Sequence, residues 1–203
     1  MVKPSQGKLL YHITHLDNIP SILKHGLLSR AELQKKTTNI KFTDIANPEI
    51  LSKRDLYKEA LSNYVLFHFY AKNPFDCAVC RKYGSENMVI ITLPRKFHEK
   101  NTFYIIPSHP LDSDKPDIYN YEDGFSRIRW DILDRETGRD YNDPEIRKAC
   151  MAECVMKYTI PVEAFYSLFV LNESVKQKVE KSLGEISLRI IVSPGMFSHV
   201  NID

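Results

Sequence analysis

Glycine is scarce and scattered in this sequence of 203 residues. The seven glycines are spread singly along the chain, and no segment gathers two or more of them. Neither the G-x-G-x-x-G fingerprint of dinucleotide-binding βαβ units nor a phosphate-binding P-loop can therefore be drawn. If a nucleotide binds to this chain, we expect another architecture to hold it.

Long apolar runs are also absent, because no stretch approaches the roughly 20 residues that span a bilayer. The first residues, MVKPSQGKLLYHIT, include a lysine but no apolar core ahead of a small-residue cleavage site. We therefore expect no membrane span and no signal peptide, and we predict a cytoplasmic protein.

Charge of one sign is not in excess, since the formal net charge is only +2. So small a value excludes the strongly basic class of nucleic-acid-binding proteins, although basic and acidic residues cluster in different segments. The chain is 43% hydrophobic and 27% charged, which is ordinary for a soluble chain. Its length suits one core, so we expect a single domain over residues 1–203.

Cysteine is limited to two close pairs, CAVC at 77–80 and the pair within CMAEC at 150–154. Two such pairs are compatible with a zinc site. The second pair has CxxxC spacing inside an apolar stretch, which favours reduced, buried cysteines that act as small hydrophobic residues. We expect no metal.

The first third of the chain predicts a strand, a helix and a long excursion. KLLYHIT (8–14) reads as a strand, and NIPSILKH (18–25) reads as a helix with a cap at Asp17 or Asn18 and with Gly26 after its end. Residues 29–61 are polar with scattered apolar positions, and one helix is expected after Pro48.

The rest of the chain mixes strands and helices without regular βαβ alternation, which favours the α+β class. Helices are expected at 73–84, from Asp143 onward and at 172–184, and a loop at 108–124. Apolar and β-branched runs predict strands at 63–71, 88–94, 102–108, 126–132, 153–160, 165–171 and 188–193.

Two polar groups in this pattern are candidate functional residues. His12 and Thr14 alternate along the first strand and share one face, whereas His15 faces the other way. Glu153 is a lone carboxylate where a short helix gives way to an apolar strand. A single histidine is more often structural or exposed, and Glu153 could be solvated at the start of its strand; buried acids, however, are rare unless they are paired or used.

Four segments together resemble the DarT family of DNA ADP-ribosyltransferase toxins, the toxins of DarT/DarG toxin–antitoxin systems. The similarity runs with gaps from about residue 8 to 165, in LYHITHLDNIPSILKHGLLS, IANPEILSKR, NYVLFHFYAKNPF and AECVMKYTIP. The family usually reads Tyr-Val-Pro-Phe-Tyr-Phe and then Pro-Met where this chain reads YVLFHFY and NPFD. That departure bears on the base and the DNA sequence that are modified.

The resemblance implies an α+β fold like that of the poly(ADP-ribose) polymerases, with a split mixed sheet and flanking helices that bind NAD without a Rossmann motif. NAD is then a co-substrate. The resemblance assigns His12 and Thr14 to NAD, with Asn18 and Tyr64 as further candidates, and it gives His15 no role.

The resemblance also implies the catalytic groups. Glu153 matches the catalytic glutamate, which stabilises the oxocarbenium-like transition state of NAD cleavage. If it also helps to deprotonate the acceptor base, its loss would cost more in rate. Arg54 matches the active-site arginine, a natural partner for the pyrophosphate or for negative charge on the acceptor.

The segment before Glu153 is expected to contact single-stranded DNA through Arg147, Tyr141 and Arg139, by cationic contacts and stacking. We expect the acidic side chains between residues 131 and 145 to point away from the DNA. Further cations that could extend a phosphate track, or simply face solvent, are Lys72, Arg81 and Lys82.

The function that the resemblance implies is cleavage of NAD and transfer of ADP-ribose to a base of single-stranded DNA, thymine or in some members guanine, with release of nicotinamide. The implied partner is an antitoxin with a macrodomain that removes the ADP-ribose. Transfer to RNA or protein, simple NAD hydrolysis and a non-catalytic binding module of the same fold are the alternatives.

Overall fold

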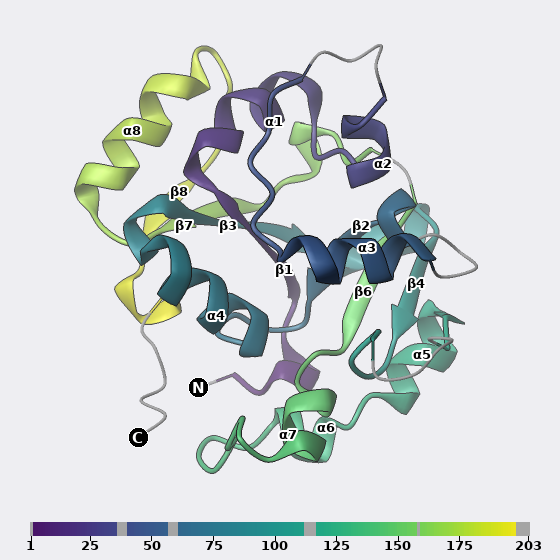
Figure 1. The fold of residues 1–203 in the computed structure, drawn as a ribbon. Coiled ribbons are helices and arrows are strands. Elements are labelled where there is room, and N and C mark those ends of the chain that lie inside the picture. The colour runs from purple at the N-terminus through teal and green to yellow at the C-terminus, as the bar shows by residue number, and fades with distance from the viewer. Residues whose placement is uncertain (1, 36–39, 57–60, 112–116, 158, 198–203) are drawn as a thin grey trace.

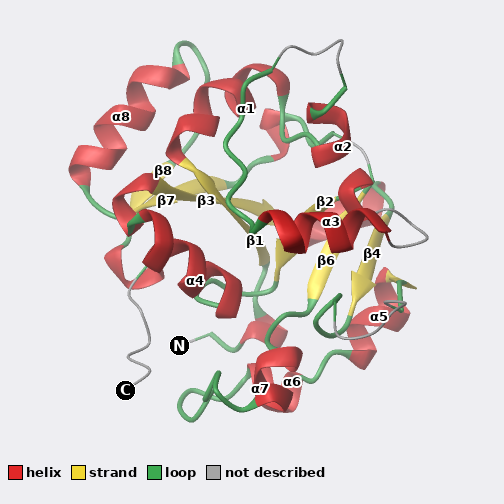
Figure 2. Ribbon diagram, viewed as in Figure 1, coloured by secondary structure: helices red, strands yellow, loops and turns green. Residues whose placement is uncertain are grey.

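The computed structural model describes residues 2–35, 40–56, 61–111, 117–157 and 159–197, with the backbone alone for 54–56. Its centre is an eight-stranded sheet in the order β5-β4-β6-β2-β1-β3-β7-β8, flanked by helices (Figures 1 and 2). The strands are β1 (Leu9–His15), β2 (Val65–His68), β3 (Met88–Pro94), β4 (Phe103–Ile106), β5 (Tyr119–Asn120), β6 (Glu153–Met156), β7 (Ser167–Val170) and β8 (Ile190–Val192).

The sheet is mixed, because β7 and β8 pair in parallel whereas the other neighbouring strands pair antiparallel. β1 pairs with β3 from Leu9 to His15. With β2, in contrast, β1 shares the single pair Tyr11↔His68 in the described ladder. The two halves of the sheet therefore part between β1 and β2, which confirms the prediction of a split mixed sheet in the α+β class.

Helices cover both faces of this sheet. On one face α1 packs against α8, and Ile19 of α1 and Val175 of α8 share a core cluster with Leu10. On the other face α4 contributes Val79 to a second cluster around Ile13. The helices are α1 (Ile19–His25), α2 (Arg30–Leu33), α3 (Pro48–Leu56), α4 (Pro74–Tyr83), α5 (Tyr121–Arg127), α6 (Trp130–Leu133), α7 (Pro144–Ala149) and α8 (Glu173–Leu183).

The connection after α1 needs a glycine. Gly26 has φ +78, and a Cβ there would lie 2.7 Å from the carbonyl oxygen of Ile160, closer than real contacts allow. The next residue, Leu27, donates its N–H to that same oxygen at 2.8 Å. The end of α1 at Gly26 is as the sequence pattern predicted. Its position beside the segment that follows β6 comes from the structure alone.

Most of the predicted elements are confirmed, but the strand expected at 126–132 is wrong. That region forms the end of α5 and the start of α6 instead. The side chain of Asn120 caps α5 by accepting from the N–H of Asp123 at 2.9 Å, and Trp130 Nε1 donates to Phe125 O at 2.9 Å. These local contacts outweigh the apolar alternation that suggested a strand, and they place β5 and most of α5 inside the predicted loop.

The four cysteines are free thiols, and all four are buried. Within the described ranges, no group of three or more His, Cys, Asp or Glu side chains is arranged to hold a metal ion. None of the helices in those ranges is both long enough and apolar enough to cross a membrane.

Candidate active site

A cavity of about 460 Å³ lies where β1 and β2 part. Side chains of β1, β2, β6, α1, α3 and α7 line it together with the segment at 42–46, and most of its wall is apolar. It brings together six of the residues predicted from sequence: His12, Thr14, Asn18, Tyr64, Arg147 and Glu153.

His12 bridges the gap between the half-sheets. Its Nδ1 lies 2.8 Å from Leu66 O on β2, and its ring packs edge-on against Phe67 with centroids 5.7 Å apart. A carbonyl oxygen only accepts, so Nδ1 carries the hydrogen and Nε2 is an acceptor in the neutral ring. Burial and, to a smaller extent, nearby His68 lower the pKa of His12 to about 4 against the opposing bond to Leu66 O, so the ring is neutral at physiological pH.

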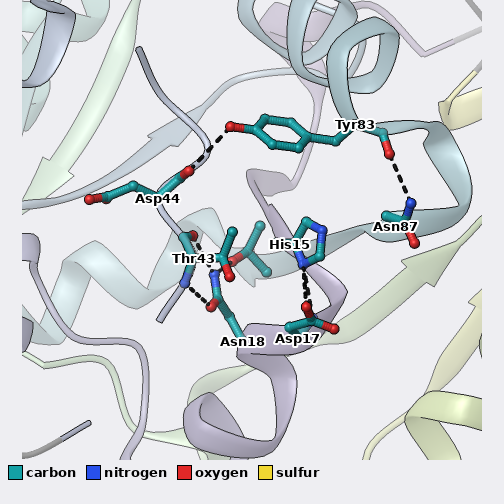
Figure 3. Close-up of polar contacts among 8 residues, drawn as sticks. His15, Asp17, Asn18, Thr43, Asp44, Tyr83 and Asn87 are labelled. Carbon is teal, nitrogen blue, oxygen red and sulfur yellow. Dashed lines mark hydrogen bonds and ion pairs between the residues drawn. The ribbon is translucent and has the colours of Figure 1, made fainter. Parts of the chain in front are cut away.

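Thr14 and Asn18 connect β1 to the segment at 42–46, and Figure 3 shows the contact of Asn18 with Thr43. Asn18 Nδ2 donates to Thr14 Oγ1 at 3.1 Å and to Thr43 O at 3.0 Å. Thr43 N in turn donates to Asn18 Oδ1 at 2.7 Å. The amide of Asn18 therefore fixes one wall of the cavity and is engaged by the chain itself.

The same segment is also held from α4. The hydroxyl of Tyr83 donates to Asp44 O at 3.3 Å (Figure 3). Arg30 forms an ion pair with the Asp44 carboxylate at 3.4 Å. His15 packs edge-on against Tyr83, with centroids 5.9 Å apart, and its Nδ1 accepts from Asp17 N. His15 thus supports the turn after β1 and is not among the residues that line the cavity.

Glu153 is the first residue of β6 and is 2% exposed. Its Cα lies opposite His68 of β2 and Ile106 of β4. Tyr64, just before β2, is also buried, and its ring packs edge-on against Tyr104 with centroids 6.2 Å apart. A carboxylate inside an apolar wall acts on developing positive charge more strongly than it would in water.

Of the predicted arginines near this cavity, the structure describes Arg147 in full and Arg54 by its backbone alone. Arg147 is exposed in the last turn of α7 and lines the cavity. The backbone of Arg54 lies in α3, one turn after the cavity-lining residues Ile50 and Leu51, and its side chain is outside the described residues.

Arg139 and Tyr141 do not line this cavity. Tyr141 is buried, donates to Lys72 O at 2.8 Å and shares a hydrogen bond with the Tyr70 hydroxyl at 3.3 Å. The guanidinium of Arg139 lies over the Tyr70 ring, 4.9 Å from its centroid. The structure therefore assigns these side chains to packing near Cys150, and their contact with DNA stays a prediction.

Other charged residues near the predicted DNA segment are engaged locally. Asp131 pairs with Arg129 at 2.8 Å, and Asp143 caps α7 by accepting from Glu145 N at 2.8 Å. Of the additional cations, Lys72 has φ +63 and donates its N–H to the Asp76 carboxylate at 3.0 Å. Arg81 and Lys82 are exposed on α4.

Two cavity-lining histidines were missed by the sequence reasoning, His68 and His109. The signal for His68 was a histidine within the aromatic run FHFY, where a buried imidazole needs a polar partner. His109 follows a strand in the short segment PSHP and accepts from Leu111 N through its Nδ1 at 3.0 Å.

Comparison with known proteins places the chain in a defined family. The sequence profile of the family described as "ssDNA thymidine ADP-ribosyltransferase, DarT" matches residues 11–198. A DNA ADP-ribosyl transferase of Escherichia coli O127:H6 is 24% identical, over 92% of this chain and 91% of that protein. A DNA ADP-ribosyl transferase–DNA ADP-ribosyl glycohydrolase fusion protein of Thermosipho africanus is 24% identical over 93% of this chain, which spans only 49% of the fusion.

Solved structures share the fold. DarT of Thermus sp. 2.9 in complex with ADP-ribosylated ssDNA superimposes with a TM-score of 0.81 at 20% identity, covering 94% of this chain and 96% of that one. Thermosipho africanus DarTG in complex with ADP-ribose has a TM-score of 0.80 at 22% identity, covering 94% of this chain and 51% of that one.

Proposed function

Because the chain belongs to the DarT family of ssDNA thymidine ADP-ribosyltransferases, we propose that it cleaves NAD and transfers ADP-ribose to a thymine of single-stranded DNA. The observation that carries this proposal is the meeting of His12, Thr14 and Glu153 in one cavity at the gap between the half-sheets. Nicotinamide is the other product.

In this proposal NAD is a co-substrate held on the β1 side of the cavity. His12 presents Nε2 as an acceptor, which suits a ribose hydroxyl, because its Nδ1 is committed to Leu66 O. Thr14 and Tyr64 complete the polar and aromatic contacts, while Asn18 holds the segment at 42–46 against the ligand. Arg54 is proposed to meet the pyrophosphate or the acceptor base.

Glu153 is the proposed catalytic carboxylate. The glycosidic C–N bond to nicotinamide breaks with its electron pair moving to the nicotinamide nitrogen, and positive charge grows on the ribose. A carboxylate that is 2% exposed stabilises this charge without much competition from water. A ring nitrogen of the base then forms the new C–N bond and loses its hydrogen as a proton.

The acceptor is proposed to approach past α7. Arg147 lies at the cavity and is suited to a DNA phosphate, and the apolar wall suits an unpaired base, which is accessible in a single strand. Arg139 and Tyr141 remain predicted DNA contacts, but the proposal does not depend on them.

We further propose an antitoxin partner with a macrodomain that removes ADP-ribose from DNA, acting in the cytoplasm. The Thermosipho africanus relative, which carries a transferase and a DNA ADP-ribosyl glycohydrolase in one chain, supports this pairing of activities.

The test is incubation of the protein with NAD and, separately, single-stranded DNA, duplex DNA, RNA and protein, followed by mass spectrometry. We expect ADP-ribose on thymine of single-stranded DNA, and a loss of about 10²-fold to 10³-fold in Glu153→Gln. Glu163→Gln, which removes an exposed carboxylate outside the cavity, is the matched control. An adduct on guanine would correct the base. An adduct only on RNA or protein, or intact NAD with every acceptor, would refute the proposal.

A further inference from the structure

We infer that the side chain of Met151 contacts the C5 methyl group of the acceptor thymine and so sets a preference for thymine over uracil. This inference rests on the proposed function and deepens it, since it names a specificity-determining residue for that reaction. Thymine and uracil present the same hydrogen-bonding groups and differ only in this methyl group. Hydrogen bonds therefore do not separate the two bases, whereas an apolar contact with the methyl group does.

Met151 is buried but lies outside the hydrophobic core. Its side chain is 8% exposed. Among the buried apolar side chains that the structure describes, Met151 alone belongs to none of the three core clusters. It lines the cavity instead. An unbranched, flexible thioether in such a wall adapts well to a small apolar group of a ligand.

The chain alternates between cavity and core from Met151 to Cys154. Ala152 and Cys154 belong to the largest core cluster, whereas Met151 and Glu153 line the cavity. Such alternation is typical of extended backbone, in which residues two apart share one face. Met151 is therefore the neighbour of Glu153 on this wall of the cavity.

One backbone oxygen holds a second apolar segment beside Met151. Lys148 O accepts from Met151 N at 3.2 Å and from His109 N at 3.0 Å. The segment that begins at His109 is thereby fixed against the end of α7, and its next two residues, Pro110 and Leu111, also line the cavity. The two adjoining segments thus present Met151, Pro110 and Leu111 to the cavity as one apolar corner.

Met151 lies between the two groups that the proposed function assigns to DNA and to the ribose. Arg147, exposed in the last turn of α7, is proposed to meet a phosphate, and Glu153, 2% exposed, is proposed to act on the ribose. Met151 follows Arg147 by four residues and precedes Glu153 by two. A nucleotide with its phosphate at Arg147 and its reacting nitrogen beside Glu153 therefore places its base at Met151.

The structure of thymine fits this order. In DNA the only ring nitrogen of thymine that carries a hydrogen is N3, so N3 is the atom that bonds to the ribose. C5, with its methyl group, is two ring positions from N3. With N3 directed at the ribose beside Glu153, the methyl group lies a short step along the wall, where Met151 is the adjacent side chain. Removal of the methyl group from water against Met151 then favours thymine.

The test is a competition between thymine and uracil. Two single-stranded oligonucleotides, identical except for deoxyuridine in place of the target thymidine, share one reaction at saturating NAD, and mass spectrometry measures both products. Their ratio reports the ratio of kcat/KM, which does not depend on how much of a variant is folded. In wild type we expect thymine to be preferred by about 10-fold to 200-fold, as one methyl group in an apolar pocket allows. In Met151→Ala the ratio should fall toward equal rates.

Truncation should also make room for a larger base. An oligonucleotide with 5-ethyluracil at the target position should compete poorly with thymine in wild type and better in Met151→Ala. The matched control is Met196→Ala, because Met196 packs against the core cluster around Ile13 and does not line the cavity. We expect this control to keep the wild-type ratios.

Met151→Gln is the second variant if Met151→Ala fails to fold, as judged by thermal unfolding. It keeps the length of the side chain but ends in a polar group, so it should lose the preference for thymine as well. Equal use of thymine and uracil by wild type, or a wild-type ratio in the Met151 variants, would overturn the methyl contact. Wild type that modifies no thymine would instead show that the proposed function is wrong.

Discussion

Asn18 and Thr43 make a two-way contact between an amide side chain and a backbone peptide (Figure 3). The N–H of Thr43 donates to Asn18 Oδ1 at 2.7 Å, and Asn18 Nδ2 donates back to Thr43 O at 3.0 Å. The same Nδ2 reaches Thr14 Oγ1 on β1. Because both ends of the amide are engaged, Asn18 acts as a positioning residue that fixes the wall of the proposed NAD site.

Asn18→Ala should raise the KM for NAD about 10-fold to 100-fold, since it removes buried hydrogen bonds worth about 1–3 kcal/mol in total. The kcat should change much less, because Glu153 is untouched. The measurement is steady-state kinetics with NAD varied. The control is Asn101→Ala. It removes a side-chain hydrogen bond of 2.9 Å to Phe97 O, and Asn101 does not line the cavity. An unchanged KM in Asn18→Ala would contradict the positioning role.

The lowered pKa of His12 makes the free energy of unfolding depend on pH. The pKa falls from 6.5 to about 4 in the folded chain because the ring is buried. The unfolded chain therefore takes up a proton first, so the contribution of neutral His12 is complete above about pH 6.5 and is lost as the pH falls toward 4. Measured by urea unfolding, the free energy of unfolding of wild type should fall by about 1–3 kcal/mol more than that of His12→Gln between pH 7 and pH 4. If the unfolding free energies of wild type and His12→Gln changed equally with pH, the role of His12 would be refuted.

Asp76 should change the free energy of unfolding with pH in the opposite direction to His12. Burial raises the pKa of this carboxyl from 3.8 to about 7, although it accepts from Lys72 N. The folded chain binds the proton more tightly than the unfolded chain, so this contribution is complete below about pH 3.8 and is lost as the pH rises toward 7. Asp76→Asn keeps an acceptor oxygen but does not titrate. Between pH 4.5 and 8 its free energy of unfolding should rise by on the order of 2 kcal/mol relative to that of wild type. Urea unfolding at both pH values tests this.

Arg147→Ala should weaken binding of single-stranded DNA and flatten its salt dependence. If Arg147 contacts one phosphate, the slope of log K against log salt should fall by about 0.7. Titration of a labelled oligonucleotide at several salt concentrations measures this slope. Arg189→Ala is the charge-matched control, because Arg189 is exposed beside β8, at the edge of the sheet away from β6. Equal slopes in the two variants would contradict the contact.

The local sequence predicted what depends on neighbours in the chain. Alternation put His12 and Thr14 on one face, Gly26 ended α1, and Asp143 with Pro144 began α7, because capping and strand periodicity are set within a few residues. The family resemblance added the split sheet and the order of its functional segments, which periodicity alone does not contain.

Contacts between distant segments were not predictable in this way. Tyr141 looked like a stacking residue in a polar loop, but its hydroxyl reaches Lys72 O, 69 positions away in sequence. His68 looked like part of a buried aromatic strand, and only the register of β2 against β6 puts it opposite Glu153. Residues 126–132 alternated like a strand, yet 126–127 end α5 and 130–132 lie in α6, where the Asn120 cap and the bond from Trp130 Nε1 to Phe125 O support the helices.

The single Tyr11↔His68 pair between β1 and β2 has a consequence for the energetics of the whole chain. A sheet of this kind gains stability from each continuous ladder, and here the central ladder stops after one pair, with the His12 ring bonded to Leu66 O in its place. A molecule that fills the gap and contacts both β1 and β6 joins the two halves as further strand pairing would. The free energy of unfolding is thus expected to rise as more of the protein binds substrate.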